Sequence, residues 1–130
     1  HELGAILVIA RSEHIEFDTN SGKLINGRVS AKLIESIFVR NSPLHDGAVL
    51  IDKDNIIAAG VVLPISDQAN LPAHIGLRHR AGVGATEHSD VLVVILSEET
   101  GKFAIARNGV LYSDIVLEEI KKEMYAAMIA

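Results

Sequence analysis

Apolar residues in this chain gather into short runs separated by polar segments, which is the pattern of a protein with both strands and helices. The runs at 3–10, 91–96 and 56–63 are continuous and rich in Val, Ile and Leu, as in strands that are buried on both faces. A shorter run, 48–51, precedes Lys53-Asp54-Asn55 and predicts an antiparallel hairpin with 56–63. The chain therefore has several buried strands, at least two of them adjacent.

A second strand pair is predicted over 91–96 and 103–106, joined by the polar turn Ser97-Glu98-Glu99-Thr100-Gly101. The segment 11–27 is mostly loop with one short strand, because polar residues and Gly interrupt its apolar positions. The segment 66–72 is a polar loop.

Three segments have the spacing of helices. The first carries one apolar stripe and begins near Ser30; the stripe consists of Val29, Leu33, Ile34, Ile37 and Phe38. A second helix is predicted over 75–88, although Gly82 and Gly84 weaken it. Ser113 or Asp114 is expected to cap a terminal helix with one apolar face formed by Leu117, Ile120, Met124 and Met128.

Hairpins mixed with helices at this density predict a mixed α/β fold: a central mixed β-sheet with antiparallel hairpins, flanked by helices. The length of 130 residues corresponds to one domain, residues 1–130. The chain begins at His1, directly before strand-like sequence, so we expect a domain taken from a longer protein.

Composition excludes several classes of protein. Twelve Lys and Arg against 17 Asp and Glu leave a net charge of −5, which argues against a nucleic-acid polymer as partner. The absence of Cys excludes disulfides and thiolate zinc sites. The apolar runs are much shorter than the roughly 18 to 20 residues that span a bilayer.

Two polar islands interrupt the aliphatic background. The first, Asn41 to Ala48, places His45 and Asp46 on a turn before a strand, where a carboxylate can bind a metal and Gly47 lets a ligand approach the backbone. An Asp-Gly step is also a common turn dipeptide, and His45 is equally consistent with a surface imidazole.

The second island, Gly76-Leu77-Arg78-His79-Arg80, offers two guanidinium groups and an imidazole, and Arg is well suited to phosphate. On a regular helix positions 78 and 80 point about 200° apart, so one of them should reach a ligand while the other supports the structure. A solvated basic face paired with Glu87 or Asp90 is the simpler alternative. Within the turn at 97–101, Glu99 is a candidate second carboxylate.

The sequence lacks a Walker phosphate loop, a dinucleotide fingerprint, a nucleophile elbow and an H-E-x-x-H motif. Four other segments of the sequence give a more specific signal. In order and spacing, the segments 43–48, 63–64, 76–81 and 97–101 resemble the diadenylate cyclase domain, which is marked by an Asp-Gly-Ala and an Arg-His-Arg motif. The resemblance covers about residues 3–109 and is greatest to the membrane-anchored type.

The resemblance implies condensation of two ATP molecules into cyclic di-AMP, with a divalent metal (Mn²⁺, Mg²⁺ or Co²⁺) as cofactor. It implies a face-to-face homodimer in which each ribose 3′-hydroxyl attacks the partner ATP. It assigns metal binding to Asp46, with His45 and Glu99, and catalysis to Asp46, Arg78, His79 and Arg80. The implied ATP-binding residues are Gly47, Ala48, Leu63, Leu77, Arg78, His79, Arg80, Ser97 and Glu99.

The same resemblance implies a cytoplasmic domain at the inner face of the cell membrane, held there by segments outside this sequence, with a regulatory protein as a further partner. Leu77 stands where related domains often have Thr, and Val62 where an aromatic residue is common. A non-catalytic module that binds ATP or cyclic di-AMP is therefore the main alternative. A metal-dependent phosphohydrolase, suggested by His45-Asp46, would need a second His-Asp pair that the sequence lacks.

Overall fold

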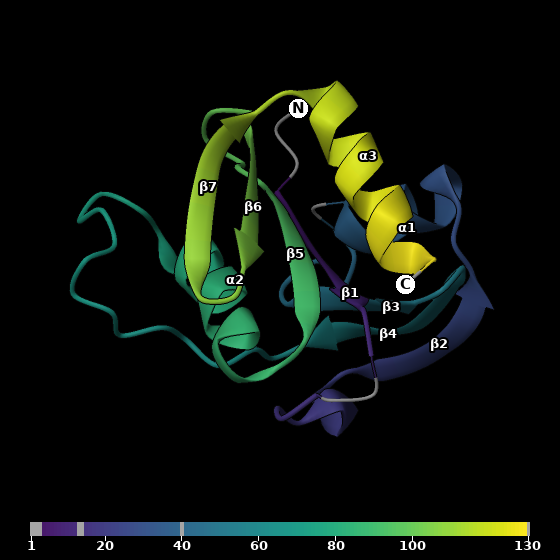
Figure 1. Cartoon of the computed structure of the whole chain (residues 1–130). Coiled ribbons are helices and arrows are strands. Elements are labelled where there is room, and N and C mark those ends of the chain that lie inside the picture. The colour runs from purple at the N-terminus through teal and green to yellow at the C-terminus, as the bar shows by residue number, and fades with distance from the viewer. Residues whose placement is uncertain (1–3, 13–14, 40, 130) are drawn as a thin grey trace.

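A computed structural model describes residues 4–12, 15–39 and 41–129. Its described part contains one seven-stranded sheet in the order β2-β4-β3-β1-β5-β6-β7, with helices on both faces (Figure 1). The strands are β1 (Ala5–Ala10), β2 (Lys23–Arg28), β3 (Ala48–Asp52), β4 (Asn55–Val61), β5 (Val91–Leu96), β6 (Phe103–Arg107) and β7 (Val110–Ile115). The helices are α1 (Ala31–Phe38), α2 (Leu77–His88), α3 (Leu117–Met128) and the short 3-10 turn η1 (Thr19–Ser21).

The predicted mixed α/β class is confirmed. Strand β1 lies in the middle of the sheet, parallel to β3 and antiparallel to β5, and the remaining neighbours pair antiparallel. The short strand expected within 11–27 is β2. The first predicted strand included Leu3, which lies outside the described residues.

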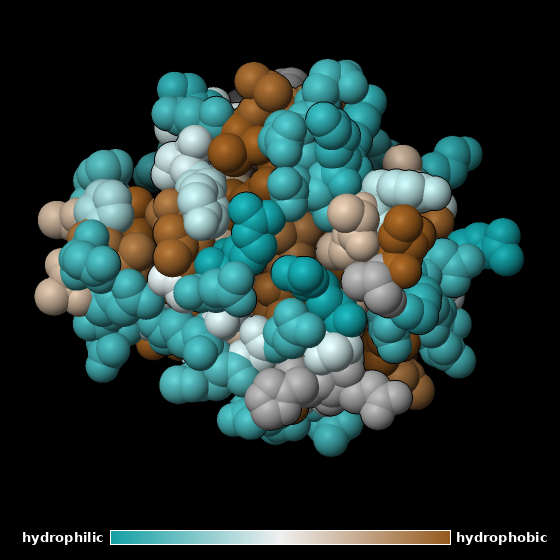
Figure 2. Space-filling view, viewed as in Figure 1, coloured by the Kyte–Doolittle hydropathy of each residue, from teal (hydrophilic) through white to brown (hydrophobic). Residues whose placement is uncertain are grey.

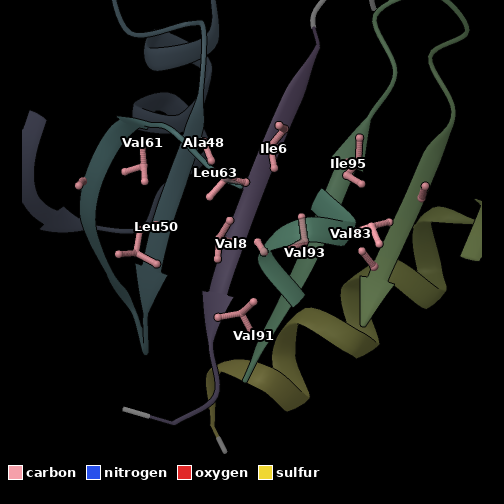
Figure 3. Close-up of a cluster of buried hydrophobic side chains, with 14 residues drawn as sticks. Ile6, Val8, Ala48, Leu50, Val61, Leu63, Val83, Val91, Val93 and Ile95 are labelled. Atoms are coloured by element: carbon pink, nitrogen blue, oxygen red, sulfur yellow. The ribbon is translucent and has the colours of Figure 1, made fainter. Parts of the chain in front are cut away.

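Two apolar clusters explain why β1, β3 and β5 read as continuous aliphatic runs. Alternate residues of these strands, such as Ile6 and Val8, face a cluster covered by Val83 and Ala85 of α2 (Figure 3). The intervening residues, such as Ile9, face a second cluster covered by α1 and α3. With both faces covered, every position along a central strand has to be apolar.

The terminal region corrects one prediction. Ser113 and Asp114 do not cap a helix; they belong to β7, the edge strand that pairs with β6. Asn108 and Gly109 form the two-residue turn between these strands, with φ angles of 53° and 77° that suit an Asn-Gly hairpin. Helix α3 begins after Val116 without a side-chain cap.

The apolar face predicted for α3 is only partly correct. Ile120 is buried, and Met124 and Met128 pack against the second cluster, but Leu117 is exposed. Two predicted boundaries also move: β4 ends at Val61 rather than residue 63, and α2 begins at Leu77 rather than residue 75. The predicted start of α1 near Ser30 is confirmed, and Ser30 Oγ caps the helix by accepting a hydrogen bond from the Leu33 amide.

Helix α2 lies close to the segment that follows β4. A Cβ atom at Gly84 would overlap the carbonyl oxygen of Pro64, so only glycine permits this approach. The glycines that weakened the helix prediction are thus explained by packing.

Hydrophilic side chains cover most of the face in Figure 2, with apolar ones in separate groups between them. Among the described residues, no helix has the length and apolar character needed to cross a membrane.

Candidate functional site

The two polar islands meet at one edge of the sheet. In the parallel pairing of β1 with β3, Leu7 lies beside Val49, so Gly4 and Asp46, which precede these two strands, lie toward the same edge of the sheet. In the antiparallel pairing of β1 with β5, Ala5 lies beside Leu96, which places Gly4 beside Ser97. Adjacent strands are about 4.8 Å apart. Residues far apart in the sequence therefore gather at this edge.

A cavity of about 500 Å³ opens on this edge, between the start of α2 and the turn that joins β5 to β6. Its lining includes five residues that the resemblance assigned to ATP: Leu77, Arg78, His79, Ser97 and Glu99. The other lining residues are His74, Ile75, Gly76, Glu98, Thr100, Lys102, Phe103, Ala104, Ser113 and Asp114.

Arg78 extends from the first turn of α2 across the start of β1. A Cβ atom at Gly4 would lie only 2.5 Å from Cζ of Arg78, so the guanidinium rests directly on this glycine. Its Nη2 lies 3.9 Å from Oε1 of Glu98, a pair too long and too exposed to neutralise the arginine fully. Arg78 therefore presents its charge toward the cavity, whereas Asp46 lies on the same edge of the sheet but does not line this cavity.

The start of α2 adds backbone donors to the same cavity. Gly76 is the residue before the helix, and no side chain caps the helix there. The first amides of a helix have no carbonyl partner within it, and the helix dipole makes this end electropositive. Together with Arg78, an uncapped helix start that lines a cavity is suited to bind phosphate.

His79 is half-buried, and its environment disfavours the charged form. Burial is the main cause of its lowered pKa, and the nearby charges of Arg78 and His74 lower the pKa further. A neutral imidazole at this position can donate or accept one hydrogen bond without adding positive charge.

Arg80 points away from the cavity, as the angular argument required of one of the two arginines. Its Nη1 donates hydrogen bonds to the carbonyl oxygens of Ser66 and Gln68, both at 3.3 Å. The Arg80 carbonyl in turn accepts from the Ser66 amide at 2.9 Å. Arg80 thus ties the long loop after β4 to α2.

His45 and Asp46 form a polar pair just before β3. His45 Nδ1 lies 2.7 Å from the Ser42 carbonyl oxygen, which can only accept, so this nitrogen carries a proton. In the neutral ring Nε2 then presents a lone pair, and it lies 3.2 Å from Oδ1 of Asp46, another acceptor. A cation between the two would satisfy both, and the Asp46 side chain is 88% exposed and accessible to one.

The residues present therefore fit a divalent metal in part. An imidazole whose second nitrogen is held by a carbonyl is the usual form of a metal-binding histidine, and a carboxylate oxygen is the ligand that Mg²⁺ and Mn²⁺ prefer. Within the ranges that the structure describes, no three His, Asp or Glu side chains converge on one point. Phosphate oxygens and water would have to complete the coordination, as is common for Mg²⁺.

The remaining predicted residues lie near this edge of the sheet but outside the large cavity. Gly47 has a φ of 100° and packs against the backbone of Gly60, so the sheet itself requires this glycine. Ala48 is buried in the core. Leu63 lines a separate cavity of about 340 Å³ with Phe17 and Pro64.

Sequence reasoning missed several residues of the cavity. The support that Gly4 gives to Arg78 was missed as well, because glycine has no side chain that could have attracted notice. Ser113 and Asp114 were assigned to a helix cap, and Lys102 was not considered. Only the strand order brings β7 beside the turn at 97–102, so the spacing of these residues in sequence contained no signal.

A family model described as "DAC: DisA bacterial checkpoint controller nucleotide-binding" matches residues 1–111. The chain is 42% identical over 110 residues to diadenylate cyclase CdaS of Bacillus thuringiensis, which covers 85% of this chain and 55% of the relative. It is also 42% identical over 125 residues to cyclic di-AMP synthase CdaA of Bacillus subtilis, covering 96% of this chain and 45% of the relative. The chain thus spans about half the length of the curated relatives it matches.

The fold is similar to a crystal structure of DacA from Staphylococcus aureus, a double mutant. The TM-score is 0.89 at 34% sequence identity, and the match covers 99% of this chain and 86% of that one.

Proposed function

The chain belongs to the DAC family of nucleotide-binding domains, and from this premise we propose that it is a diadenylate cyclase that condenses two ATP molecules into cyclic di-AMP. The observation that supports the proposal is the cavity at the sheet edge, which Arg78, His79, Ser97 and Glu99 line together, with Asp46 before the neighbouring strand β3 on the same edge. A cation, a carboxylate and an uncapped helix start on one edge are the groups that nucleotidyl transfer needs.

The reaction forms two bonds and breaks two. Each ribose 3′-oxygen bonds to the α-phosphorus of the other ATP, and each bond from an α-phosphorus to the bridging oxygen of its β-phosphate breaks, so that two pyrophosphates leave. The two hydroxyl protons pass to solvent by way of Asp46. Catalysis of such a transfer consists mainly of alignment and charge stabilisation.

Each residue at this edge has a role in this proposal. Arg78 and the amides at the start of α2 bind the phosphates, and Ser97 contributes a hydroxyl at the neighbouring strand end. His79 is held in its neutral form, so it hydrogen-bonds to the nucleotide and does not neutralise phosphate charge. Arg80 acts indirectly, because it holds the loop that packs along α2.

Asp46 and His45 would hold the divalent metal, with Glu99 as a further carboxylate on the cavity side. When bound, such an ion acidifies or orients the 3′-hydroxyl and offsets phosphate charge. Mn²⁺, Mg²⁺ and Co²⁺ are all compatible with one imidazole and carboxylate oxygens.

The reaction joins two ATP molecules, and two copies of the chain would each supply one of them. One ATP supplies one hydroxyl and one α-phosphorus, and the two ends must come from different molecules to give a product with two nucleotides. We therefore propose a face-to-face homodimer in which the exposed Asp46 of each copy faces its partner's nucleotide. By resemblance to the membrane-anchored type, we place the domain at the cytoplasmic face of the membrane, with a regulatory protein as a further partner.

A regulatory module that binds ATP or cyclic di-AMP without turnover is the second candidate. It is favoured by one observation: Leu77 and Val62, where related domains often carry Thr and an aromatic residue, both expose apolar side chains.

Incubation of the purified domain with ATP and Mn²⁺ or Mg²⁺, followed by separation of the nucleotides, distinguishes the two. The cyclase converts ATP to cyclic di-AMP with one pyrophosphate released per ATP. Tight binding of ATP with no product in the presence of either metal would establish the regulatory module instead.

A further inference from the structure

We propose that Lys102, a residue outside the sequence motifs, binds the β- and γ-phosphates of ATP and stabilises the pyrophosphate as it leaves. The inference rests on the proposed cyclase function and assigns the site of the leaving group within it. Lys102 lines the same cavity as Arg78 and Ser97, from the turn that joins β5 to β6.

The strand order gives the direction of the bound nucleotide. Across the sheet edge the order runs from Asp46 before β3, through Gly4 before β1 and Ser97 after β5, to Lys102 before β6. Lys102 hydrogen-bonds through its carbonyl oxygen to the Ser97 amide, which fixes the backbone at this end. If the 3′-hydroxyl reacts near Asp46 and the α-phosphate lies by Arg78, the leaving group extends toward Lys102.

The balance of charges in the cavity also supports a role for Lys102 in phosphate binding. Among the described residues that line the cavity, two carry a Lys or Arg side chain, Arg78 and Lys102. Three carry a carboxylate: Glu98, Glu99 and Asp114. Arg80 points to the loop and offers no charge here. The lining thus has more carboxylates than Lys and Arg side chains, so a bound triphosphate needs both Arg78 and Lys102.

Lys102 forms an ion pair with Asp114 that a phosphate group can replace. Its Nζ lies 3.8 Å from Oδ1 of Asp114, and the two side chains are 66% and 70% exposed. Both are so accessible to water that the pair is weak and can be exchanged for phosphate.

A bulge in β7 places Asp114 opposite this lysine. The register between β6 and β7 shifts between the Phe103 and Ile105 pairings, and Asp114 has a φ of 57°. Consecutive strand residues normally face opposite sides, yet Ser113 and Asp114 both line the cavity. The strand is thus distorted in a way that supplies a carboxylate to the cavity rim.

The test compares Lys102→Gln with Lys121→Gln. Lys121 lies on α3, carries the same charge, is similarly exposed and pairs weakly with Glu118 at 3.9 Å. Calorimetric titration of each protein with inorganic pyrophosphate, ATP and AMP, in the presence of Mg²⁺, separates the leaving group from the rest of the nucleotide. We expect K102Q to weaken pyrophosphate and ATP binding on the order of tenfold and to leave AMP within about twofold of wild type.

Two further variants sharpen the result. Lys102→Arg should restore pyrophosphate binding, because it keeps the charge. Asp114→Asn should tighten it, because it frees the lysine while Asn still tolerates the positive φ. K121Q should match wild type with all three ligands.

Equal pyrophosphate affinity in K102Q and K121Q would overturn the inference, as would a loss of AMP affinity equal to that of ATP. Because the readout is binding, it remains decisive if the wild type binds ATP without forming cyclic di-AMP, an outcome that would refute the cyclase and not the role of Lys102. A wild type that binds neither ATP nor pyrophosphate would overturn both.

Discussion

The guanidinium of Arg78 lies directly on Gly4, with Cζ 2.5 Å from the point where a Cβ atom of residue 4 would be. This contact joins the first turn of α2 to the start of the central strand and places a cation in the cavity that Ser97 also lines.

Substitution of Gly4 by Ala should displace Arg78 and raise the KM for ATP about tenfold, because phosphate binding depends strongly on position. The contact is with the end of a flexible side chain, so the melting temperature should change little. Steady-state kinetics and thermal unfolding measure the two effects. Gly27→Ala is the control, since a Cβ there meets nothing closer than Leu33 at 3.4 Å; equal KM values in the two variants would contradict the role of the contact.

Asp46→Asn should lower kcat about 100-fold or more while leaving the fold intact, because a neutral amide is a poor metal ligand and stabilises little developing charge. The side chain is highly exposed, so its replacement costs little stability. Cyclic di-AMP formation across a Mn²⁺ titration is the measurement. Near-normal turnover at saturating metal would be evidence against this role, and chelation by EDTA should abolish activity of the wild type.

The two arginines of the second island should differ in what their loss affects. Arg80→Gln removes two hydrogen bonds to the loop carbonyls of Ser66 and Gln68, and we expect the free energy of unfolding to fall by about 1 kcal/mol. Among the described residues, Arg78→Gln removes a long ion pair with Glu98 and the guanidinium that packs on Gly4; it should unfold much like wild type in urea, yet lose most activity. The reverse pattern, with R78Q less stable than R80Q, would show that the roles are assigned wrongly.

The lowered pKa of His79 makes stability depend on pH. Because the folded state holds this group neutral below its usual pKa, the unfolded state binds more protons as the pH falls below about 6.5. The contribution of neutral His79 to the free energy of unfolding is complete above pH 6.5 and is lost as the pH falls below it. Between pH 7 and pH 5.5 the melting temperature of the wild type should therefore fall relative to that of His79→Gln. A pH-independent difference would exclude this origin.

If two copies are needed to form cyclic di-AMP, specific activity should rise with protein concentration below the dimer dissociation constant and level off above it. Initial rates over a dilution series, with sedimentation on the same samples, would measure both. A rate strictly proportional to protein concentration down to nanomolar levels would require another arrangement.

The sequence was sufficient wherever the determining interactions are local. Continuous aliphatic runs identified the buried strands, and Ser30 marked the start of α1. Strand β7 was missed because it is a mostly exposed edge strand in which Ser113 and Asp114 interrupt the apolar residues and resemble a helix cap. Its one clear signal was Asn108-Gly109, whose positive φ angles form the hairpin.

By itself the sequence determined the class of fold, the two polar islands and the fact that Arg78 and Arg80 cannot both face one ligand. Only the tertiary structure decided that Arg78 faces the cavity, that Gly4 supports it and that Lys102 and Asp114 lie at the far end of the same sheet edge. The physical reason is that helical angles and turn conformations follow from neighbouring residues, whereas the order and register of strands arise from pairing between segments far apart in the chain.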